Sequence, residues 1–222
     1  MPTILTWILA ILGALGGILW LRDHAARFFR GISHRRKLKR PPQDFFYNRV
    51  EISARISNQG NEWQTIRKAT ITALSDGLAA VDVGVRPRSA TKCDFSIANH
   101  DLKLEEREES VSNHTHVAII PHSPLRKDES LSFDFHCNFS RDGGVPPAED
   151  AFVWANSRRV DELVLRVIFT EVPTQPVRFK ISDISDHVLQ EGVLQIDHMT
   201  HEARFHTHTP RPHLHYAVVW RY

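Results

Sequence analysis

The sequence predicts an all-β domain behind one N-terminal transmembrane helix. We expect the domain to be an antiparallel β-sandwich, with a partly open β-barrel as the alternative. Three observations lead to this prediction: residues 4–21 carry no charge, residues 22–40 are strongly basic, and apolar and polar residues alternate in short runs through residues 45–222. The expected parts are a transmembrane anchor over 1–21, a basic juxtamembrane helix and linker over 22–44, and the β-domain over 45–222.

The apolar run ILTWILAILGALGGILWL at 4–21 predicts a membrane anchor. As a helix it would be about 27 Å long, enough to span a bilayer core. Trp7 and Trp20 lie near its ends, where indole rings prefer the headgroup level. A cleaved signal peptide is the alternative, but it requires a basic N-terminal region and a small-residue cleavage site, whereas this chain begins MPT. We therefore expect the anchor to be retained.

Small residues recur every four positions in this anchor. Gly13 and Gly17 form one such pair, and Ala10 and Ala14 form another. This spacing lets two helices approach closely in lipid, so it predicts association of the spans into a homo-oligomer. The alternative is that glycine and alanine are simply common in transmembrane helices.

The basic residues crowd directly behind the anchor. The chain has 28 Lys/Arg and 26 Asp/Glu. Residues 22–40 hold eight of the basic residues and one of the acidic residues, so the rest of the chain is acidic. Cations beside a span mark its cytoplasmic side. We therefore expect a single span in a bacterial inner membrane, with the N-terminus outside and the β-domain in the cytoplasm. An acidic β-domain disfavours nucleic acid as a partner. The residues expected to contact anionic headgroups are Arg35, Arg36, Lys37, Lys39 and Arg40.

Alternation with a period of two predicts nine to eleven strands in the β-domain. On two of these strands the residues that should share one apolar face are Leu131, Phe133, Phe135, Cys137 and Phe139 in 130–139, and Leu163, Leu165, Val167 and Phe169 in 161–170. Residues 102–110 are expected to form a solvated hairpin or loop, and 141–150 a loop. The expected strands are 49–57, 64–74, 78–85, 93–98, 116–121, 130–139, 161–170, 176–182, 192–196, 203–208 and 213–222.

Several short motifs of the β-domain occur in the same order in a known group of proteins. They are SDGL at 75–78, PLRKDESLSFDF at 124–135, VDELVLRVIF at 160–169, PVRF at 176–179 and the closing AVVWRY. In these motifs the chain resembles a functionally uncharacterised β-rich domain of bacterial, often actinobacterial, signalling and regulatory proteins. It departs from that family at Lys127-Asp128-Glu129, where a Gly usually precedes the Glu, and at Trp220-Arg221-Tyr222, where the family ends Trp-x-Trp. The resemblance implies a sensing or interaction module and supplies no catalytic residues.

Four histidines near the C-terminus form the densest candidate site. His206 and His208 should share one strand face and His213 and His215 another, and the TPRP turn between the pairs could bring them together around zinc. A pH-responsive surface is a second interpretation. The third, which we favour, is the polar face of edge strands, because the spacing matches no familiar zinc signature.

Other catalytic patterns are absent from the sequence, including GxSxG, a Walker loop, a dinucleotide fingerprint and HExxH. Cys93 and Cys137 are each expected to have a structural role. We therefore expect no enzyme activity and no cofactor other than the candidate zinc.

The favoured function is a membrane-anchored sensor or effector, for example in bacterial defence or signalling. It would bind a small signalling ligand or a protein partner and respond through association of its spans. One alternative is an adaptor that recruits a cytosolic complex through an exposed sheet edge. The other is a histidine-dependent metal-binding enzyme.

The predicted topology can be tested with reporters fused after Tyr222. A fluorescent protein that matures only in the cytoplasm should fluoresce there, and alkaline phosphatase, which folds only in the periplasm, should stay inactive, because the cations of residues 22–40 hold that side in the cytoplasm. Active phosphatase, or a mature chain beginning near residue 26, would show that the topology is wrong.

Overall fold

The computed structural model describes residues 44–222 except 86–91, 109–114, 141–148 and 156. The predicted anchor, with Gly13 and Gly17, lies outside the described residues. So do Arg35, Arg36, Lys37, Lys39 and Arg40 of the basic segment. Within the part that is described, no helix has the length and apolar character needed to cross a membrane.

The described residues form fourteen strands and one short 3-10 turn, which confirms the all-β prediction. The elements are β1 (Phe45–Ser57), η1 (Asn58–Gly60), β2 (Glu62–Ala73), β3 (Val81–Val85), β4 (Lys92–Ile97), β5 (Leu102–Glu108), β6 (Thr115–Pro121), β7 (Ser130–Ser140), β8 (Asp150–Ala155), β9 (Val160–Phe169), β10 (Arg178–Ser182), β11 (Val188–Val193), β12 (Ile196–Asp197), β13 (Glu202–His208) and β14 (His215–Trp220).

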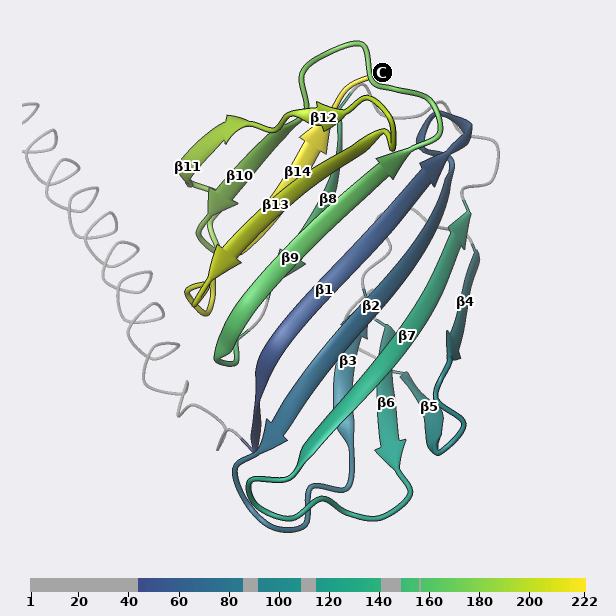
Figure 1. Cartoon of the computed structure of the whole chain (residues 1–222), viewed down its shortest axis with the longest axis vertical. Coiled ribbons are helices and arrows are strands. Elements are labelled where there is room, and N and C mark those ends of the chain that lie inside the picture. Colours follow the sequence, from purple (N-terminus) through teal and green to yellow (C-terminus); the bar gives the residue numbers. More distant parts are fainter. Residues whose placement is uncertain (1–43, 86–91, 109–114, 141–148, 156) are drawn as a thin grey trace, which may run out of the picture. The chain divides into compact units, whose positions relative to one another are not determined.

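These strands make three sheets, and the described strands close no barrel. The largest has seven strands in the order β12-β13-β9-β1-β2-β7-β4. A four-stranded sheet, β11-β10-β14-β8, and a three-stranded sheet, β3-β6-β5, lie behind the two ends of the large sheet (Figure 1). One pair, β1 with β9, is parallel, so the expectation of a purely antiparallel arrangement was wrong there.

The long strands form because their apolar residues alternate. On β1, Val50, Ile52, Ala54 and Ile56 are at most 2% exposed, while the residues between them point to the opposite face. The same pattern was predicted for β7 and β9, and it is confirmed by the burial of Phe133, Phe135 and Cys137 on β7 and of Leu163, Leu165, Val167 and Phe169 on β9. A strand with this pattern buries one face and leaves the other for polar side chains.

The core lies between the large sheet and the two smaller sheets. Residues from all three sheets belong to a single buried cluster. Aromatic rings join the large sheet to the four-stranded sheet: the ring of Trp220 lies 5.5 Å from that of Phe169 and 5.5 Å from that of Trp63, measured between centroids. Val83 and Ile119, on β3 and β6, are at most 1% exposed and belong to the same cluster. Each small sheet therefore covers part of the same apolar face.

Three segments differ from the sequence-based expectation. β8 lies partly in the predicted 141–150 loop and was not expected as a strand, and β5 is a strand where a solvated hairpin or loop was expected. The predicted strand 192–196 is split between β11 and β12, because residues 194–195 pass from the four-stranded sheet to the large one. β8 pairs with β14 from a distant part of the chain, so there tertiary pairing overrides the local pattern. β5, β11 and β12 each pair with a strand that is their neighbour in the sequence.

Leu165 tests how much the core packing contributes to stability. Leu165→Ala should lower the free energy of unfolding by about 3 kcal/mol, because the side chain is 0% exposed and its loss leaves a cavity. Leu189→Ala, at a position that is 57% exposed, should change it by less than about 0.5 kcal/mol. Urea unfolding of a fragment covering residues 44–222 measures both changes, and equal losses would contradict the assigned core.

Candidate functional site

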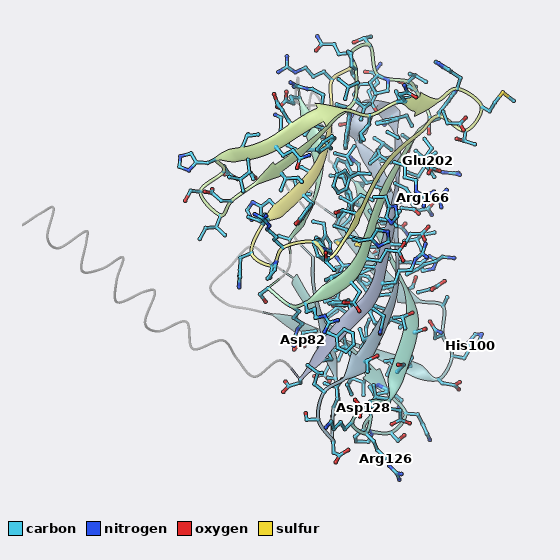
Figure 2. All side chains as sticks on the ribbon, turned by 60° about the vertical axis from the view of Figure 1, so that its left-hand side comes forward. Asp82, His100, Arg126, Asp128, Arg166 and Glu202 are labelled. Atoms are coloured by element: carbon cyan, nitrogen blue, oxygen red, sulfur yellow. The ribbon has the colours of Figure 1, made fainter. Side chains whose placement is uncertain are left out.

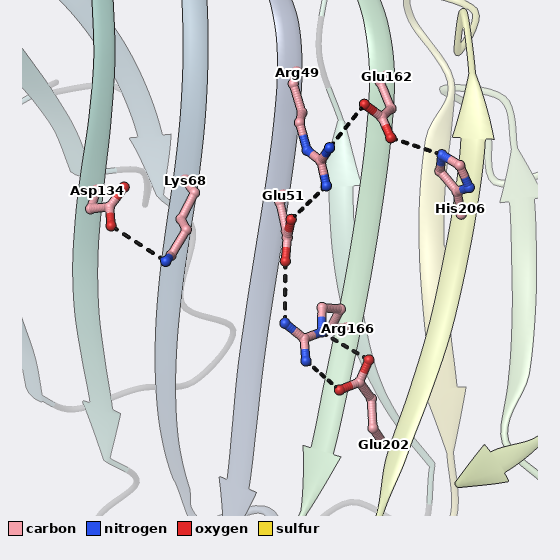
Figure 3. A network of polar contacts seen from close by, with 8 residues as sticks. All are labelled: Arg49, Glu51, Lys68, Asp134, Glu162, Arg166, Glu202 and His206. Atoms are coloured by element: carbon pink, nitrogen blue, oxygen red, sulfur yellow. Dashed lines mark hydrogen bonds and ion pairs between the residues drawn. The ribbon is translucent and has the colours of Figure 1, made fainter. Parts of the chain in front are cut away.

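The outer face of the seven-stranded sheet carries a network of ion pairs (Figure 3). Arg49 on β1 contacts Glu51 at 2.9 Å and Glu162 on β9 at 3.3 Å. Lys68 on β2 contacts Asp134 on β7 at 3.6 Å. These side chains face away from the core because they alternate with its apolar residues, so the sheet presents a mixed-charge surface.

Arg166 is the centre of this network. Its Nε atom donates to Glu202 Oε1 at 2.8 Å and its Nη2 atom donates to Oε2, while Nη1 donates to Glu51 Oε1 at 3.2 Å. Figure 2 shows Arg166 and Glu202 side by side, far from Arg126 and Asp128 at the other end of the β-domain. Burial alone would raise the pKa of Glu51, but the hydrogen bonds from Arg49 and Arg166 hold that pKa below its ordinary value.

The first histidine pair lies at one margin of this face. His206 Nε2 contacts Glu162 Oε1 at 3.1 Å, and the rings of His206 and His208 are 4.7 Å apart in an edge-to-face arrangement. Both side chains belong to β13, so they share a face as predicted. Cross-strand pairing with β9 supplies the carboxylate, which the sequence alone did not indicate.

The second histidine pair is elsewhere. His215 lies on β14 in the four-stranded sheet, where its Nδ1 atom is 3.5 Å from Asp186, and His213 lies on the preceding turn with a φ of 65°. The TPRP turn therefore connects two different sheets and does not return the chain alongside β13. Among the described residues, no three His, Cys, Asp or Glu side chains are placed to hold a metal ion. The arrangement gives no support to a zinc site made by all four histidines.

A shallow hollow of about 380 Å³ opens near the η1 turn, where β1, β2, β4 and β7 approach one another. Its lining is mostly polar: Arg55, Ser57, Glu62, Trp63, Gln64, Asp94, Asn138, Phe139 and Ser140. Most of these side chains lie on the same outer face as the ion pairs. The hollow adds a wide, polar depression to that face and brings no recognisable catalytic set together.

The β10–β11 hairpin carries several exposed apolar side chains. β11 is the outermost strand of its sheet and pairs with β10 alone among the described strands. Val188, Leu189 and Val193 on β11 are 52%, 57% and 66% exposed, and Ile184 in the hairpin turn is 75% exposed. An edge strand with exposed apolar side chains is a ready site for another strand to pair, and most folds protect such edges.

The hairpin is held in a defined conformation. Asp183 Oδ1 accepts hydrogen bonds from the backbone N–H groups of Ser185 at 2.8 Å and His187 at 3.0 Å, which orders the turn around Ile184. The hydrogen bond from the backbone N–H of His187, and with it that from Ser185, holds the pKa of the Asp183 carboxyl below its ordinary value. On the inner side, Gly192 allows the Phe179 ring to lie across β11, since a Cβ atom there would be 2.5 Å from Phe179 Cε1.

A bulge places the two valines of β11 on one face of the sheet. Ile181 lies opposite Gln190 but Ser182 lies opposite Val188, so Leu189 is the extra residue. Val188 and Val193 consequently lie on the same face, opposite Ser182 and Arg178. The two exposed valines therefore lie at either end of residues 189–192, and we call residues 188–193 the apolar strip.

The outer part of the hairpin is acidic. Residues 183–193 contain Asp183, Asp186 and Glu191 and no Lys or Arg. The cations of β10, Arg178 and Lys180, contact Glu149 at 3.3 Å each. The open edge of β11 therefore offers negative charge beside its apolar side chains.

Comparisons with known proteins show similarity of fold. A candidate protease from Parabacteroides distasonis superposes with a TM-score of 0.51 at 10% identity, over 82% of this chain and 41% of its own. An M1 zinc metallopeptidase variant from Deinococcus radiodurans, bound to a Tyr-Ser-Ala substrate, gives 0.48 at 12% identity over 80% and 43%. Native leukotriene A4 hydrolase from Saccharomyces cerevisiae gives 0.47 at 12% identity over 84% and 32%.

The first of these likenesses, with a TM-score above 0.5, concerns the fold alone. The chain spans less than half the length of each of these three structures. No protein-family model matches the chain, and no curated protein matches it. The resemblance to a bacterial signalling domain therefore stays a prediction.

The ion-pair network predicts a pH dependence that Glu51→Gln removes. Because the pKa of Glu51 is lowered in the folded state, its stabilising effect is present above its ordinary value of 4.5 and is lost as the pH falls through the folded value. The native chain should exceed the variant in unfolding free energy by about 1 kcal/mol at pH 7, and the difference should shrink as the pH is lowered from 7 through the folded pKa of Glu51.

Urea unfolding of the 44–222 fragment across this pH range measures the difference. Asp101→Asn, in an exposed turn, is the control and should leave the unfolding curve unchanged. A difference between native chain and Glu51→Gln that stays constant with pH would contradict the network's role.

Proposed function

We propose that the chain is a membrane-tethered, non-enzymatic adaptor, and that the open edge of β11 binds an extended segment of a partner protein. The observation that carries this proposal is the exposure of Val188, Leu189 and Val193 on a strand that pairs on one side only. Strand addition to such an edge combines main-chain hydrogen bonds with contacts to alternate side chains.

The chemistry of the edge favours a basic partner segment. Asp183, Asp186 and Glu191 lie in the same hairpin as the apolar strip, whereas the neighbouring cations of β10 contact Glu149. Complementary charge steers association and excludes acidic competitors. The same carboxylates make anionic lipid an unfavourable ligand, because headgroups would meet negative charge. A second copy of the chain is disfavoured for the same reason, since two acidic edges would face one another.

The ordered conformation of the hairpin lowers the entropic cost of binding a partner segment. The Asp183 turn and the packing of Phe179 on Phe205, with ring centroids 5.2 Å apart, hold β11 in an extended conformation before a partner arrives. A preformed edge loses little conformational entropy on binding.

The proposal includes the membrane span and the association of spans in response to partner binding. The span at 4–21 would keep the adaptor at the membrane, and its Gly13 and Gly17 would allow spans to associate when partners gather. In this form the adaptor also serves as the sensor or effector that the sequence suggests, with recruitment at β11 as the event that is sensed. No peptidase activity is assigned, since likeness of fold at 10% identity carries no function.

A synthetic peptide tests binding at β11. The probe is an extended peptide of alternating valine and threonine with two lysines at each end, and binding to the full chain in neutral lipid nanodiscs is measured by fluorescence anisotropy. We expect saturable binding, and we expect slower hydrogen exchange of the β11 amides when the peptide is bound.

Three controls separate the contributions. N-methylation of the peptide at alternate residues should abolish binding, because it removes the donors of the new ladder. Glu191→Lys should weaken binding roughly tenfold by reversing the charge. Val153→Lys, at a 40% exposed position on β8 at the other edge of this sheet, should have no effect.

Two results would overturn the proposal. One is equal affinity for the N-methylated peptide, which would exclude strand addition. The other is protection of the β11 amides by anionic nanodiscs without peptide, which would show that the hairpin docks on lipid.

A further inference from the structure

Two thiols lie next to each other on the core-facing side of the seven-stranded sheet. Cys93 Sγ on β4 and Cys137 Sγ on β7 are 3.5 Å apart. Cys93 lies opposite Phe139 and Phe95 lies opposite Cys137, so the cysteines are diagonal neighbours on one face of an antiparallel pair. Both are free cysteines.

The two thiols have different surroundings. Cys137 is 1% exposed, whereas Cys93 is only partly buried. The hydrogen bond with Cys93 and then burial raise the pKa of Cys137 far above its ordinary value, although the nearby Arg67 guanidinium acts in the opposite direction. While Cys93 is reduced, Cys137 is therefore a protonated thiol, and Cys93 is the sulfur that a dissolved reagent can reach.

We propose that Cys93 and Cys137 form a reversible redox pair, which a peroxide oxidises to a disulfide between β4 and β7. The thiolate of Cys93 attacks hydrogen peroxide, taking one oxygen to become a sulfenic acid and releasing hydroxide. The Cys137 sulfur then attacks the sulfenic sulfur. The S–S bond forms, the S–O bond breaks, and the leaving hydroxide takes the Cys137 proton as water. The two sulfurs together lose two electrons, and the peroxide gains them.

The position of β4 makes this closure feasible. A disulfide needs its sulfurs about 2.05 Å apart, and diagonal neighbours in a sheet are usually somewhat too widely spaced for an unstrained bridge. One strand must therefore shift. β4 is six residues long and lies at the edge of the sheet, with β7 as its pairing partner among the described strands, so it can move without breaking a second ladder. In a cytosolic domain, disulfides of this kind are transient and report the redox state.

Mass spectrometry of the full chain in nanodiscs tests the pair. After hydrogen peroxide treatment, alkylation and proteolysis, we expect one cross-linked peptide joining Cys93 and Cys137, lighter by two hydrogen atoms than the two free peptides. Both thiols should become unavailable to alkylation together, and dithiothreitol should restore both. The yield should not depend on protein concentration, because the bridge forms within one chain.

Matched variants assign the order of events. In Cys137→Ser, Cys93 should accumulate as a sulfenic acid that dimedone traps, and in Cys93→Ser, Cys137 should remain alkylatable after unfolding. The cross-link in the unsubstituted chain needs no variant, so it remains decisive if a serine at the buried position destabilises the domain. Two reduced thiols after treatment, a cross-link between separate chains, or oxidation of Cys93 to a sulfinic acid without a bridge would each overturn the proposal.

Discussion

The structure depends on the burial of β1 along one whole face. Val50, Ile52, Ala54 and Ile56 lie between the flanking strands β2 and β9 and beneath the smaller sheets, with at most 2% of any side chain exposed. A slip of one residue in either pairing would turn this set outward and bring charged residues into the core. The register of the large sheet is therefore strongly determined, and the outer network follows from it.

The outer face of the large sheet and the β11 edge of the four-stranded sheet differ in how they are protected. The outer face of the large sheet is covered by charged side chains that satisfy one another, with Arg166 joined to carboxylates on both neighbouring strands. The four-stranded sheet instead ends at β11, where apolar side chains and an open ladder remain. The described domain therefore combines a sheet face of paired charges with an edge strand that exposes apolar side chains, and the proposed recruiting role uses this edge.

The sequence predicted which residues are buried where apolar and polar residues alternate along a strand. It predicted poorly which strands pair with one another. The buried faces of β7 and β9 were predicted from the period of two, although Leu131 and Phe139 are only half-buried and Val164, on the opposite face of β9, is also 0% exposed. The parallel pairing of β1 with β9 was missed, since residues 58–159 separate them and nothing local reports it. β11 lies at the edge of its sheet and most of its residues are exposed, which its own sequence does not indicate. The two cysteines were each expected to be structural, and their proximity depends on the β4–β7 register.

The histidine-rich segment shows the same division between local and long-range information. Local sequence determines that His206 and His208 share a face, because strand geometry repeats every two residues. The sequence by itself likewise determined the all-β class and the apolar core, since both depend on the order of apolar and polar residues along each strand. The tertiary structure alone decided that β13 and β14 belong to different sheets and that Glu162 meets His206. It also decided that β11 has no second neighbour among the described strands. These features depend on which strands pair across long loops, and that choice is made by the packing of the whole core.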